Sequence, residues 1–416
     1  MRVLIIGINY RPELTGIGPY TADLAEYLAG RGDDVTVIGG LPHYPTWHIA
    51  AGTPRRLVSE ERIERVRLVR AAHYVPARQD ALRRAVYEAT FGLTGLLASR
   101  RVERPQAIVG VVPTLSGGLL ARVLSKTFTA PYGILFQDLM GPAASQSGIA
   151  GGGLVASATA RMERWAVARA SAVGVVATSF VPYVRSLGVP PQDIAHVPNW
   201  NRLVEPDTSV DDVRARFGWT DGRQVVLHAG NIGLKQGLEQ VVDAARLAKD
   251  RGEPLRFVFS GGGSQEDAIR AVARGLDNVQ FLGVQPEGMH ASLLAATDVL
   301  LLSERSTQVD MSLPSKLTSY YAAGRPIVAA VGMAGASAEE VRRSGSGLVV
   351  PAGQPEAILE ALGQLRSEPA LAGRLGTAGR SYGASHASAS SGLARGAELV
   401  DMIAMDRPRI ALETAA

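Results

Sequence analysis

The stretch VVLHAGNIGLKQGLEQVVDAARLAKD, residues 225–250, decides the fold class of this 416-residue chain. It begins with a short apolar run, continues through a glycine-rich loop that carries Lys235, and ends in a segment whose apolar residues recur at helical spacing. A buried strand followed by a loop and an amphipathic helix is the repeating unit of parallel sheets covered by helices. The pattern recurs on both sides of this stretch and predicts an α/β protein.

The chain divides into two such α/β halves, separated by a polar stretch around residues 200–215. We expect two doubly wound, Rossmann-like domains, 1–200 and 201–370, and a helical tail, 371–416, that could pack back on the first domain. Ligands bind beyond the carboxyl ends of the strands in such sheets, which places the expected site in a central cleft between the domains. The predicted strands are 2–7, 34–40, 107–112, 132–136, 172–178, 194–199, 225–230, 256–262, 279–283, 299–303, 326–331 and 347–350.

Composition narrows the class of protein. The chain has no cysteine, which excludes disulfides and thiolate sites and suits a reducing compartment. No apolar stretch approaches the roughly 18 residues of a membrane span, and the N-terminal apolar run breaks at Gly7, so we expect a cytoplasmic protein. Residues 54–104 contain 12 arginines and 6 acidic residues. That excess suits an anionic partner, with a solvated arginine-rich surface as the alternative, whereas nucleic acid is disfavoured because 54–70 lacks aromatic residues for stacking.

Two lysines lie where predicted strands pass into helices. Lys235 follows a strand, but its loop is not a P-loop, because the pattern G-x-x-x-x-G-K-[ST] does not occur. Lys316 occupies the first turn of a predicted helix, 316–323, with Ser315 as the N-cap and Gly324 at the end. A lysine at a helix N-terminus opposes the helix dipole, and a bound anion removes that penalty. The pair predicts a diphosphate site, although Lys235 taken alone is more typical of a surface lysine.

Two glycine-rich loops follow other predicted strands. Gly261 and Gly263 lie in a loop of the second half, and they allow close approach of backbone N–H groups to a phosphate. Gly16 and Gly18 open a helix after the first strand. They come too late after that strand for a dinucleotide fingerprint, so an NAD site is disfavoured, and a tight turn remains the alternative explanation.

These segments together resemble a known family. Five motifs occur in the order and spacing of the retaining GT-B glycosyltransferases of family 4: INYRPELTGIGPYTADLAEYLAGRG (8–32), GNIGLKQGLEQVVDAA (230–245), FSGGG (259–263), VQFLG (279–283) and LPSKLTSYYAAGRPIVA (313–329). Within that family the chain is similar to the bacterial exopolysaccharide and O-antigen type, which includes the colanic acid and N-acetylfucosamine transferases. The resemblance runs from Met1 to about residue 365. It implies the GT-B fold, with the acceptor in the N-terminal half and a nucleotide-sugar donor in the C-terminal half.

The resemblance also implies which residues bind the donor. Asn231 stands where arginine is common in the family, so Lys235 is expected to act together with Lys316, with Ser315 and Ser319 beside them. The remaining matches are Gly230, Asn231, Gly233 and Lys235 in the donor loop, Gly261 and Gly263 in the second donor loop, Phe281 and Leu282 near the base, and Gly16 and Gly18 in the N-terminal loop that closes over the sugar phosphate.

Some family residues are missing here. Many members carry two glutamates eight positions apart, the second of which binds the ribose hydroxyls; here the two positions hold Met311 and Ser319. Asp310 and Glu304 are nearby carboxylates that could compensate, and a solvated loop is the alternative for both. A histidine that often precedes an aspartate in the cleft is replaced by glutamine, which leaves Asp138 after it.

The family's chemistry implies retention of anomeric configuration, with the lysines stabilising the departing nucleoside diphosphate. The sequence has no D-x-D, so we expect neither a metal nor a cofactor. Asp138 is the candidate for positioning the acceptor hydroxyl, and it could instead N-cap the segment that follows. His43 and Tyr44, after the second strand, are candidates for lining the acceptor pocket, with aromatic packing of the turn as the alternative.

We therefore expect a hexosyl- or N-acetylhexosaminyl-type glycosyltransferase that elongates a lipid-linked glycan for a surface polysaccharide, in the cytoplasm or on the inner face of the plasma membrane. The arginine-flanked segment 80–101 is either an ordinary domain helix or a membrane-surface helix. The alternative functions are a transferase for a soluble secondary metabolite, a sugar-nucleotide epimerase of similar twin-domain fold, and a non-catalytic nucleotide-sugar-binding subunit.

Overall fold

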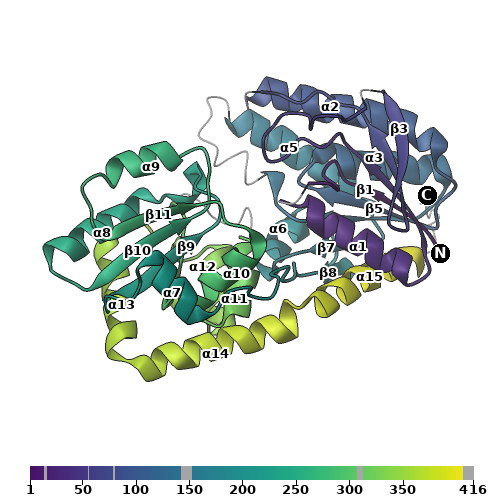
Figure 1. Ribbon diagram of the computed structural model, residues 1–416. Helices are drawn as coiled ribbons and strands as arrows, with labels where there is room; N and C mark the ends of the chain where they lie inside the picture. Colours follow the sequence, from purple (N-terminus) through teal and green to yellow (C-terminus); the bar gives the residue numbers. More distant parts are fainter. Residues whose placement is uncertain (14–15, 55, 78–79, 142–151, 307–312, 406–416) are drawn as a thin grey trace. The chain divides into compact units, whose positions relative to one another are not determined.

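The chain folds into two compact units. The structure is a computed structural model that describes residues 1–416 except 14–15, 55, 78–79, 142–151, 307–312 and 406–416 (Figure 1). The first unit comprises Met1–Pro198 and the chain from Gly392 onward, and the second comprises Asn199–Ser391. Each unit is built around one largely parallel sheet with helices packed against it, which confirms the predicted pair of Rossmann-like bodies.

The sheet of the first unit has the strand order β3-β4-β2-β1-β5-β6-β7-β8. Every pair is parallel except β3 with β4. The order reverses direction at β1, which is the switch point where ligands bind in folds of this type. The strands are β1 (Arg2–Ile6), β2 (Asp34–Gly39), β3 (Val58–Ile63), β4 (Val66–Ala71), β5 (Ala107–Val112), β6 (Tyr132–Phe136), β7 (Ala172–Val175) and β8 (Ile194–His196).

Helices of the first unit cover its sheet. On one side α3 packs against β5 and also touches both α2 and α5. Two other helices of this unit, α1 and α15, lie close together. A Cβ built on Gly396 of α15 would stand 2.7 Å from Leu24 Cδ1 of α1. The helices are α1 (Gly18–Gly30), α2 (Ala81–Ala98), α3 (Leu115–Phe128), α5 (Gly152–Val167), α6 (Val181–Ser186) and α15 (Ala389–Met405), with short 3-10 turns η1 (Ser99–Arg101), η2 (Thr178–Phe180) and η3 (Pro191–Asp193).

The hairpin β3–β4 was not among the predicted strands. Its sequence is rich in arginine, which the composition explained by an anionic partner or, alternatively, by a solvated surface. In the structure Arg70 is buried in β4, where its guanidinium donates to Glu61 Oε1 at 2.5 Å, Gly40 O at 3.0 Å and Arg11 O at 2.6 Å. Part of the positive charge therefore ties the edge of the sheet to the loop after β1.

The sheet of the second unit is fully parallel, in the order β11-β10-β9-β12-β13-β14. The strands are β9 (Gln224–Ala229), β10 (Leu255–Ser260), β11 (Val279–Gly283), β12 (Val299–Ser303), β13 (Ile327–Val331) and β14 (Gly347–Pro351). The helices are α7 (Val210–Phe217), α8 (Glu239–Asp250), α9 (Glu266–Val272), α10 (Glu287–Ala296), α11 (Lys316–Ala323), α12 (Ala336–Ser344), α13 (Pro355–Ser367) and α14 (Pro369–His386), with the turn η4 (Leu234–Gln236).

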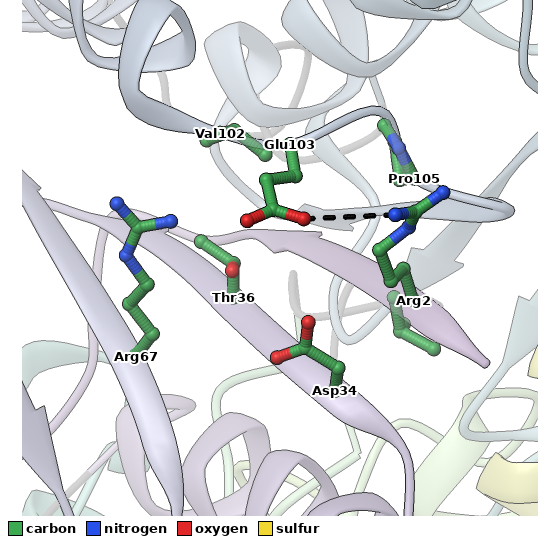
Figure 2. Close-up of a pocket in the computed structure, with 8 residues that line it drawn as sticks. Arg2, Asp34, Thr36, Arg67, Val102, Glu103 and Pro105 are labelled. Atoms are coloured by element: carbon green, nitrogen blue, oxygen red, sulfur yellow. Dashed lines mark ion pairs between the residues drawn. The ribbon is translucent and has the colours of Figure 1, made fainter.

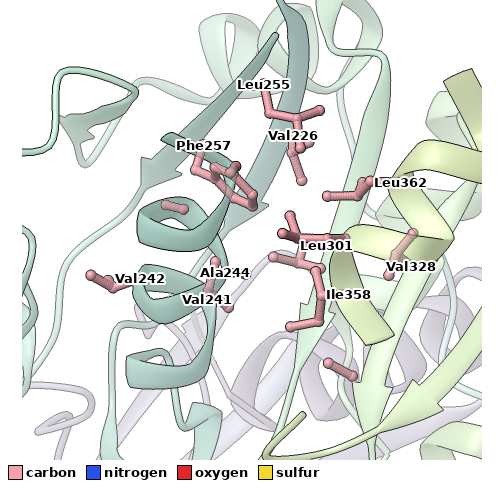
Figure 3. Close-up of a cluster of buried hydrophobic side chains, with 14 of the residues drawn as sticks. Val226, Val241, Val242, Ala244, Leu255, Phe257, Leu301, Val328, Ile358 and Leu362 are labelled. Atoms are coloured by element: carbon pink, nitrogen blue, oxygen red, sulfur yellow. The ribbon is translucent and has the colours of Figure 1, made fainter. Parts of the chain in front are cut away.

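Alternate residues of these strands fill two cores, one on each face of the sheet. Figure 3 shows one of them, where Val226, Phe257 and Leu301 of the strands meet Val241 of α8 and Ile358 of α13. The neighbouring strand residues, such as Val225 and Leu300, pack into the opposite core with α10 and α11. Burial on both faces explains why the strands are nearly continuous apolar runs.

The expected tail consists of two helices that belong to different units. α14 lies in the second unit, and α15, apart from its first turn, lies in the first. Leu399 and Ile403 of α15 are fully buried. A Cβ built on Gly133 of β6 would stand only 2.4 Å from Ile403 Cδ1, and one on Gly174 of β7 would stand 2.6 Å from Leu399 Cδ2. α15 thus packs directly on strands that precede it by more than 200 residues in the sequence.

Candidate functional site

Two glycine loops of the second unit pack against each other at the carboxyl ends of β9 and β10. Gly230 N donates to Ser260 O at 2.8 Å, and Ile232 N donates to Gly262 O at 2.9 Å. Gly261 has φ +139°, and a Cβ there would stand 1.9 Å from Gly230 O. The sequence needs glycine at this position because the second loop crosses the backbone of the first.

The predicted donor-loop residues gather around this crossing. A Cβ on Gly263 would stand 2.4 Å from Ile232 O and 2.6 Å from Asn231 Oδ1. Gly233 N donates to Gln236 Oε1 at 3.1 Å, which closes the loop into η4. Lys235 lies in η4 with an exposed side chain, and its carbonyl accepts from Arg305 N at 3.0 Å.

Lys316 reaches this loop from α11. Its Nζ lies 3.4 Å from His228 Nε2, and a Cβ on Gly230 would also stand 3.4 Å from Nζ. Burial lowers the pKa of Lys316 to about 8, and the carboxylate of Glu304 partly offsets that shift. A partly desolvated ammonium at the end of β9 suits an anion, since an anion there would compensate the lost hydration.

Glu304 connects the two lysines electrostatically. Burial raises the pKa of this carboxyl group, whereas a hydrogen bond from Ser337 Oγ, at 2.9 Å, and the charges of Lys316 and Lys235 lower it. Both ammonium groups therefore act on one carboxylate just after β12. Glu304 thus lies inside the lysine site, whereas Asp310 and Met311 fall outside the described residues.

His228 belongs to this site but was not predicted. It is buried in β9, and its Nε2 lies 3.3 Å from Asn231 O as well as beside Lys316. Burial, and then the charge of Lys316, hold the pKa of His228 well below its usual range, so the ring is neutral. The signal in the sequence was a lone polar residue in an apolar strand two positions before the donor-loop glycine.

The strand β11 places the two residues expected near the base. Phe281 stacks on Phe259 of β10, with ring centroids 5.0 Å apart. The guanidinium carbon of Arg270 lies 4.4 Å from the centroid of the Phe281 ring. Leu282 O accepts from Gln285 Nε2 at 2.5 Å, which bends the chain away after the strand. Both residues are half-buried at the edge of the donor loops.

The prediction that Ser315 caps α11 through its side chain is wrong. The Ser315 backbone is already helical, with φ −58° and ψ −23°, and its hydroxyl makes no capping hydrogen bond. A capping side chain normally requires an extended backbone at that position. The exposed Ser315 hydroxyl and the half-buried Ser319, one turn after Lys316, flank the lysine, and Gly324 ends the helix in the left-handed conformation as predicted.

A second group of candidates assembles in the first unit around Glu13, which was not predicted. Its Oε1 accepts from His43 N at 2.8 Å and Tyr44 N at 2.9 Å, which ties the loop after β2 to the loop after β1. Gly16 has φ +72°, and a Cβ there would stand 2.8 Å from Tyr44 Cε1. A Cβ on Gly18 would stand 3.3 Å from Glu13 Oε2.

Tyr44 and His43 have different environments. Tyr44 is 37% exposed, and its pKa is raised by burial and by the nearby charges of Asp138 and Glu13. His43 is buried, with Nδ1 at 2.7 Å from Leu41 O and Nε2 at 3.2 Å from Tyr87 OH. Burial lowers the pKa of His43. Tyr44 and Asp138 therefore lie near each other with Gly16, whereas His43 supports the loop from behind.

Glu163 accepts backbone N–H groups at the start of the segment that Asp138 could have capped. The N–H groups of Met140 and Gly141 donate to the carboxylate of Glu163, each at 3.1 Å. Those donors at the start of the following segment are therefore satisfied from α5. Residues 142–151 lie outside the described part of the chain.

Two hollows lie at the amino ends of the strands, away from these residues. The one in Figure 2, between Arg2, Asp34 and Glu103, has a volume of about 10 Å³, which is room for about one water molecule. The other, of about 840 Å³, lies at the starts of β9, β12 and β13 and is lined by the ion pair Arg214–Asp298. Among the described residues, no group of three His, Asp or Glu side chains could hold a metal ion.

Comparison with known proteins identifies the family of the chain. Residues 15–200 match the family model of a glycosyl transferase 4-like domain, and residues 223–368 match that of glycosyl transferases group 1. The chain is 35% identical over 337 residues to a protein of Escherichia coli (strain K12) described as colanic acid biosynthesis glycosyl transferase WcaI. That alignment covers 78% of this chain and 82% of the relative. A Pseudomonas aeruginosa protein described as the glycosyltransferase WbjE is 25% identical over 179 residues, 42% of this chain and 44% of the relative.

Solved structures of low identity share the fold. Sucrose-phosphate synthase from Thermosynechococcus elongatus aligns with a TM-score of 0.75 at 18% identity, covering 96% of this chain and 98% of that one. Anabaena HepE in complex with UDP aligns with a TM-score of 0.69 at 15% identity, covering 96% of this chain and 100% of that one. Both domain matches, the 35% identity to the Escherichia coli relative and the fold lead to one conclusion: the chain belongs to the family 4 glycosyltransferases, which have the GT-B fold.

Proposed function

We propose that this glycosyltransferase moves a hexosyl or N-acetylhexosaminyl group from a nucleoside-diphosphate donor to a hydroxyl group of a lipid-linked glycan. The product would be an intermediate of a surface polysaccharide, as the description of its Escherichia coli relative suggests for that protein. The observation that carries the donor assignment is the half-buried Lys316 ammonium, held 3.4 Å from His228 Nε2 beside the donor-loop glycine.

The lysine site would act on the leaving group. Negative charge accumulates on the nucleoside diphosphate as the sugar–phosphate bond breaks, and Lys316 and Lys235 supply positive charge that is already in place. Preorganised groups of this kind contribute about 3 to 4 kcal/mol each to transition-state stabilisation. In this proposal the lysines take the part that a metal ion plays elsewhere, and transfer proceeds without metal or cofactor.

The acceptor would enter from the side of Tyr44 and Asp138. Asp138 is proposed to orient the acceptor hydroxyl group so that it attacks the anomeric carbon on the face from which the phosphate departs. The sugar–phosphate bond breaks as the new bond forms, the departing phosphate takes the hydroxyl proton, and attack on that face retains the anomeric configuration. Tyr44 and Gly16 would contact the sugars, with Glu13 fixing the loop that carries them.

Donor binding should depend on pH through Lys316. Its pKa of about 8 in the free protein means that the ammonium form is lost as the pH rises through 8, so donor affinity should fall by about tenfold per pH unit above that value. Calorimetry between pH 7 and 9, with the donor that a panel of nucleotide sugars identifies, measures the inflection. The Lys316→Met variant should bind weakly and without this inflection. An unchanged inflection in that variant would assign the titration to another group.

A panel of UDP-, GDP- and dTDP-sugars identifies the donor. Ligand at about a hundredfold excess over Kd stabilises the folded state by about 2.7 kcal/mol, so the correct donor should raise the melting temperature and the others should not. Product analysis with that donor alone then separates the functions. Conversion of the donor sugar without acceptor would support an epimerase, and binding without turnover on any acceptor would support a binding subunit.

A further inference from the structure

α2 exposes an apolar face that the core of its unit does not use. Leu82 is 76% exposed and Leu93 is 65% exposed, and Val86 and Leu97 are also exposed. These four positions are separated by four, seven and four residues, which places them in one stripe along a helix. The opposite face, with Tyr87 and Phe91, is buried against the unit. The helix is therefore apolar on both faces, although one of them meets solvent.

The arginines of α2 and of the turn after it lie near the two ends of the helix. Residues 80–101 contain four arginines and two acidic residues. Asp80 caps the helix and pairs with Arg83, and Glu88 turns inward, where it accepts from Ser116 N at 3.1 Å and from Ser116 Oγ at 2.5 Å. Arg100 and Arg101 are exposed in η1, directly after the helix. The exposed stripe thus carries no carboxylate. The arginines at its N-terminal end pair with Asp80 and Glu88, whereas Arg100 and Arg101 supply the positive charge at its C-terminal end.

The buried face of α2 holds the loop that carries the acceptor candidates. Tyr87 OH lies 3.2 Å from His43 Nε2, and the Arg84 guanidinium lies 4.7 Å from the centroid of the Tyr87 ring and 5.5 Å from that of Trp47. The helix therefore joins an outward apolar stripe to the segment His43–Trp47. Tyr74, which is exposed and anchored by its N–H to Thr90 Oγ1 at 3.0 Å, adds an amphipathic ring next to the helix.

We propose that α2 docks this protein on an anionic lipid surface, with its leucines among the acyl chains and with Arg100 and Arg101 at the phosphate headgroups. The helix has 18 residues and is about 27 Å long. An apolar stripe with a basic end is the pattern of a helix that lies in the interface plane. Within the described residues, no helix is long and apolar enough to cross a bilayer. Docking there would bring the His43–Trp47 loop to the surface where a lipid-linked acceptor resides, and that use rests on the proposed function.

Vesicle sedimentation tests the docking without donor or acceptor. The intact protein should bind vesicles of phosphatidylethanolamine and phosphatidylglycerol, and Leu93→Gln/Leu97→Gln should weaken binding on the order of tenfold for each leucine. Met405→Gln is the matched control, because Met405 is 81% exposed on α15 of the same unit. That variant should bind like the wild type.

Arginine variants separate charge from apolar insertion. Arg100→Gln/Arg101→Gln should lose about fivefold per arginine on the anionic vesicles, and little on phosphatidylcholine vesicles. Added salt should reproduce the loss in the wild type. Equal salt sensitivity in the double variant would assign the electrostatic attraction to other residues and overturn this part of the proposal.

Other outcomes overturn the docking itself. Absence of wild-type binding, or unchanged binding of Leu93→Gln/Leu97→Gln, would do so. So would light scattering that shows a dimer converted to a monomer by the leucine substitutions, because a second copy would then cover the face. Transfer to a detergent-solubilised acceptor without vesicle binding would reject the docking and leave the proposed function standing, whereas vesicle binding without transfer would do the reverse.

Discussion

Lys316→Met is expected to lower kcat/KM for the donor by about 10²- to 10³-fold, which corresponds to about 3 to 4 kcal/mol of lost transition-state stabilisation. The reason is geometric, since Lys316 Nζ is fixed beside His228 and over Gly230. Steady-state kinetics with the identified donor measure the loss. The unliganded variant should melt no lower than the wild type, because the substitution removes an ammonium whose pKa burial has lowered to about 8.

Lys249→Met provides the control for this substitution. Lys249 lies in α8 of the same unit and is exposed, with Nζ 3.0 Å from Asp277 Oδ1. Its removal should leave kcat/KM within about twofold, as expected for a surface ion pair. Wild-type turnover of Lys316→Met would refute the assignment of the diphosphate site to this lysine.

Gly261→Ala should destabilise the second unit by about 3 kcal/mol and abolish donor binding. A Cβ at this position would stand 1.9 Å from Gly230 O, and φ +139° is strained for any residue with a side chain. The two donor loops would have to separate, which moves the backbone N–H groups around Asn231. Urea unfolding followed by tryptophan fluorescence, to which Trp200 and Trp219 of the second unit contribute, measures the stability, and donor calorimetry measures the binding.

Gly262→Ala is the neighbouring control. A Cβ on Gly262 would stand 3.3 Å from Val284 Cγ2 and 3.4 Å from Glu266 Oε2, and both atoms end side chains that can shift. Its stability cost should stay below about 1 kcal/mol. Similar costs for the two alanine variants would mean that the crossing of the loops does not limit stability.

The sequence predicted the parts of the fold that are encoded locally. The apolar strands of the second unit and the loop with Gly230 and Lys235 follow from consecutive residues, because buried parallel strands and glycine loops have short-range signatures. The hairpin β3–β4 was missed, since Arg70 becomes buried only through carbonyl groups about 30 and 59 residues away in the chain.

The site was predicted less completely than the fold. Lys316 and Lys235 were inferred from helix starts, and Glu304 was named as a carboxylate that could compensate for a missing glutamate. His228 was missed, because it joins Lys316 through a contact between residues 88 positions apart that has no local pattern. Glu13 is likewise recognisable only once His43 N and Tyr44 N donate to it. The prediction that the Ser315 side chain caps α11 was wrong although the local sequence favoured it. Serine is a common N-cap residue, but the Ser315 backbone is already helical.

The packing of α15 also sets an order of events during synthesis. Leu399 and Ile403 fill space against β6 and β7, so the first unit cannot complete its core until α15 has left the ribosome. The second unit is contiguous from Asn199 to Ser391 and has all of its strands and helices earlier. The donor-binding half should therefore reach its native state before the half that begins at the N-terminus, reversing the usual vectorial order of domain folding.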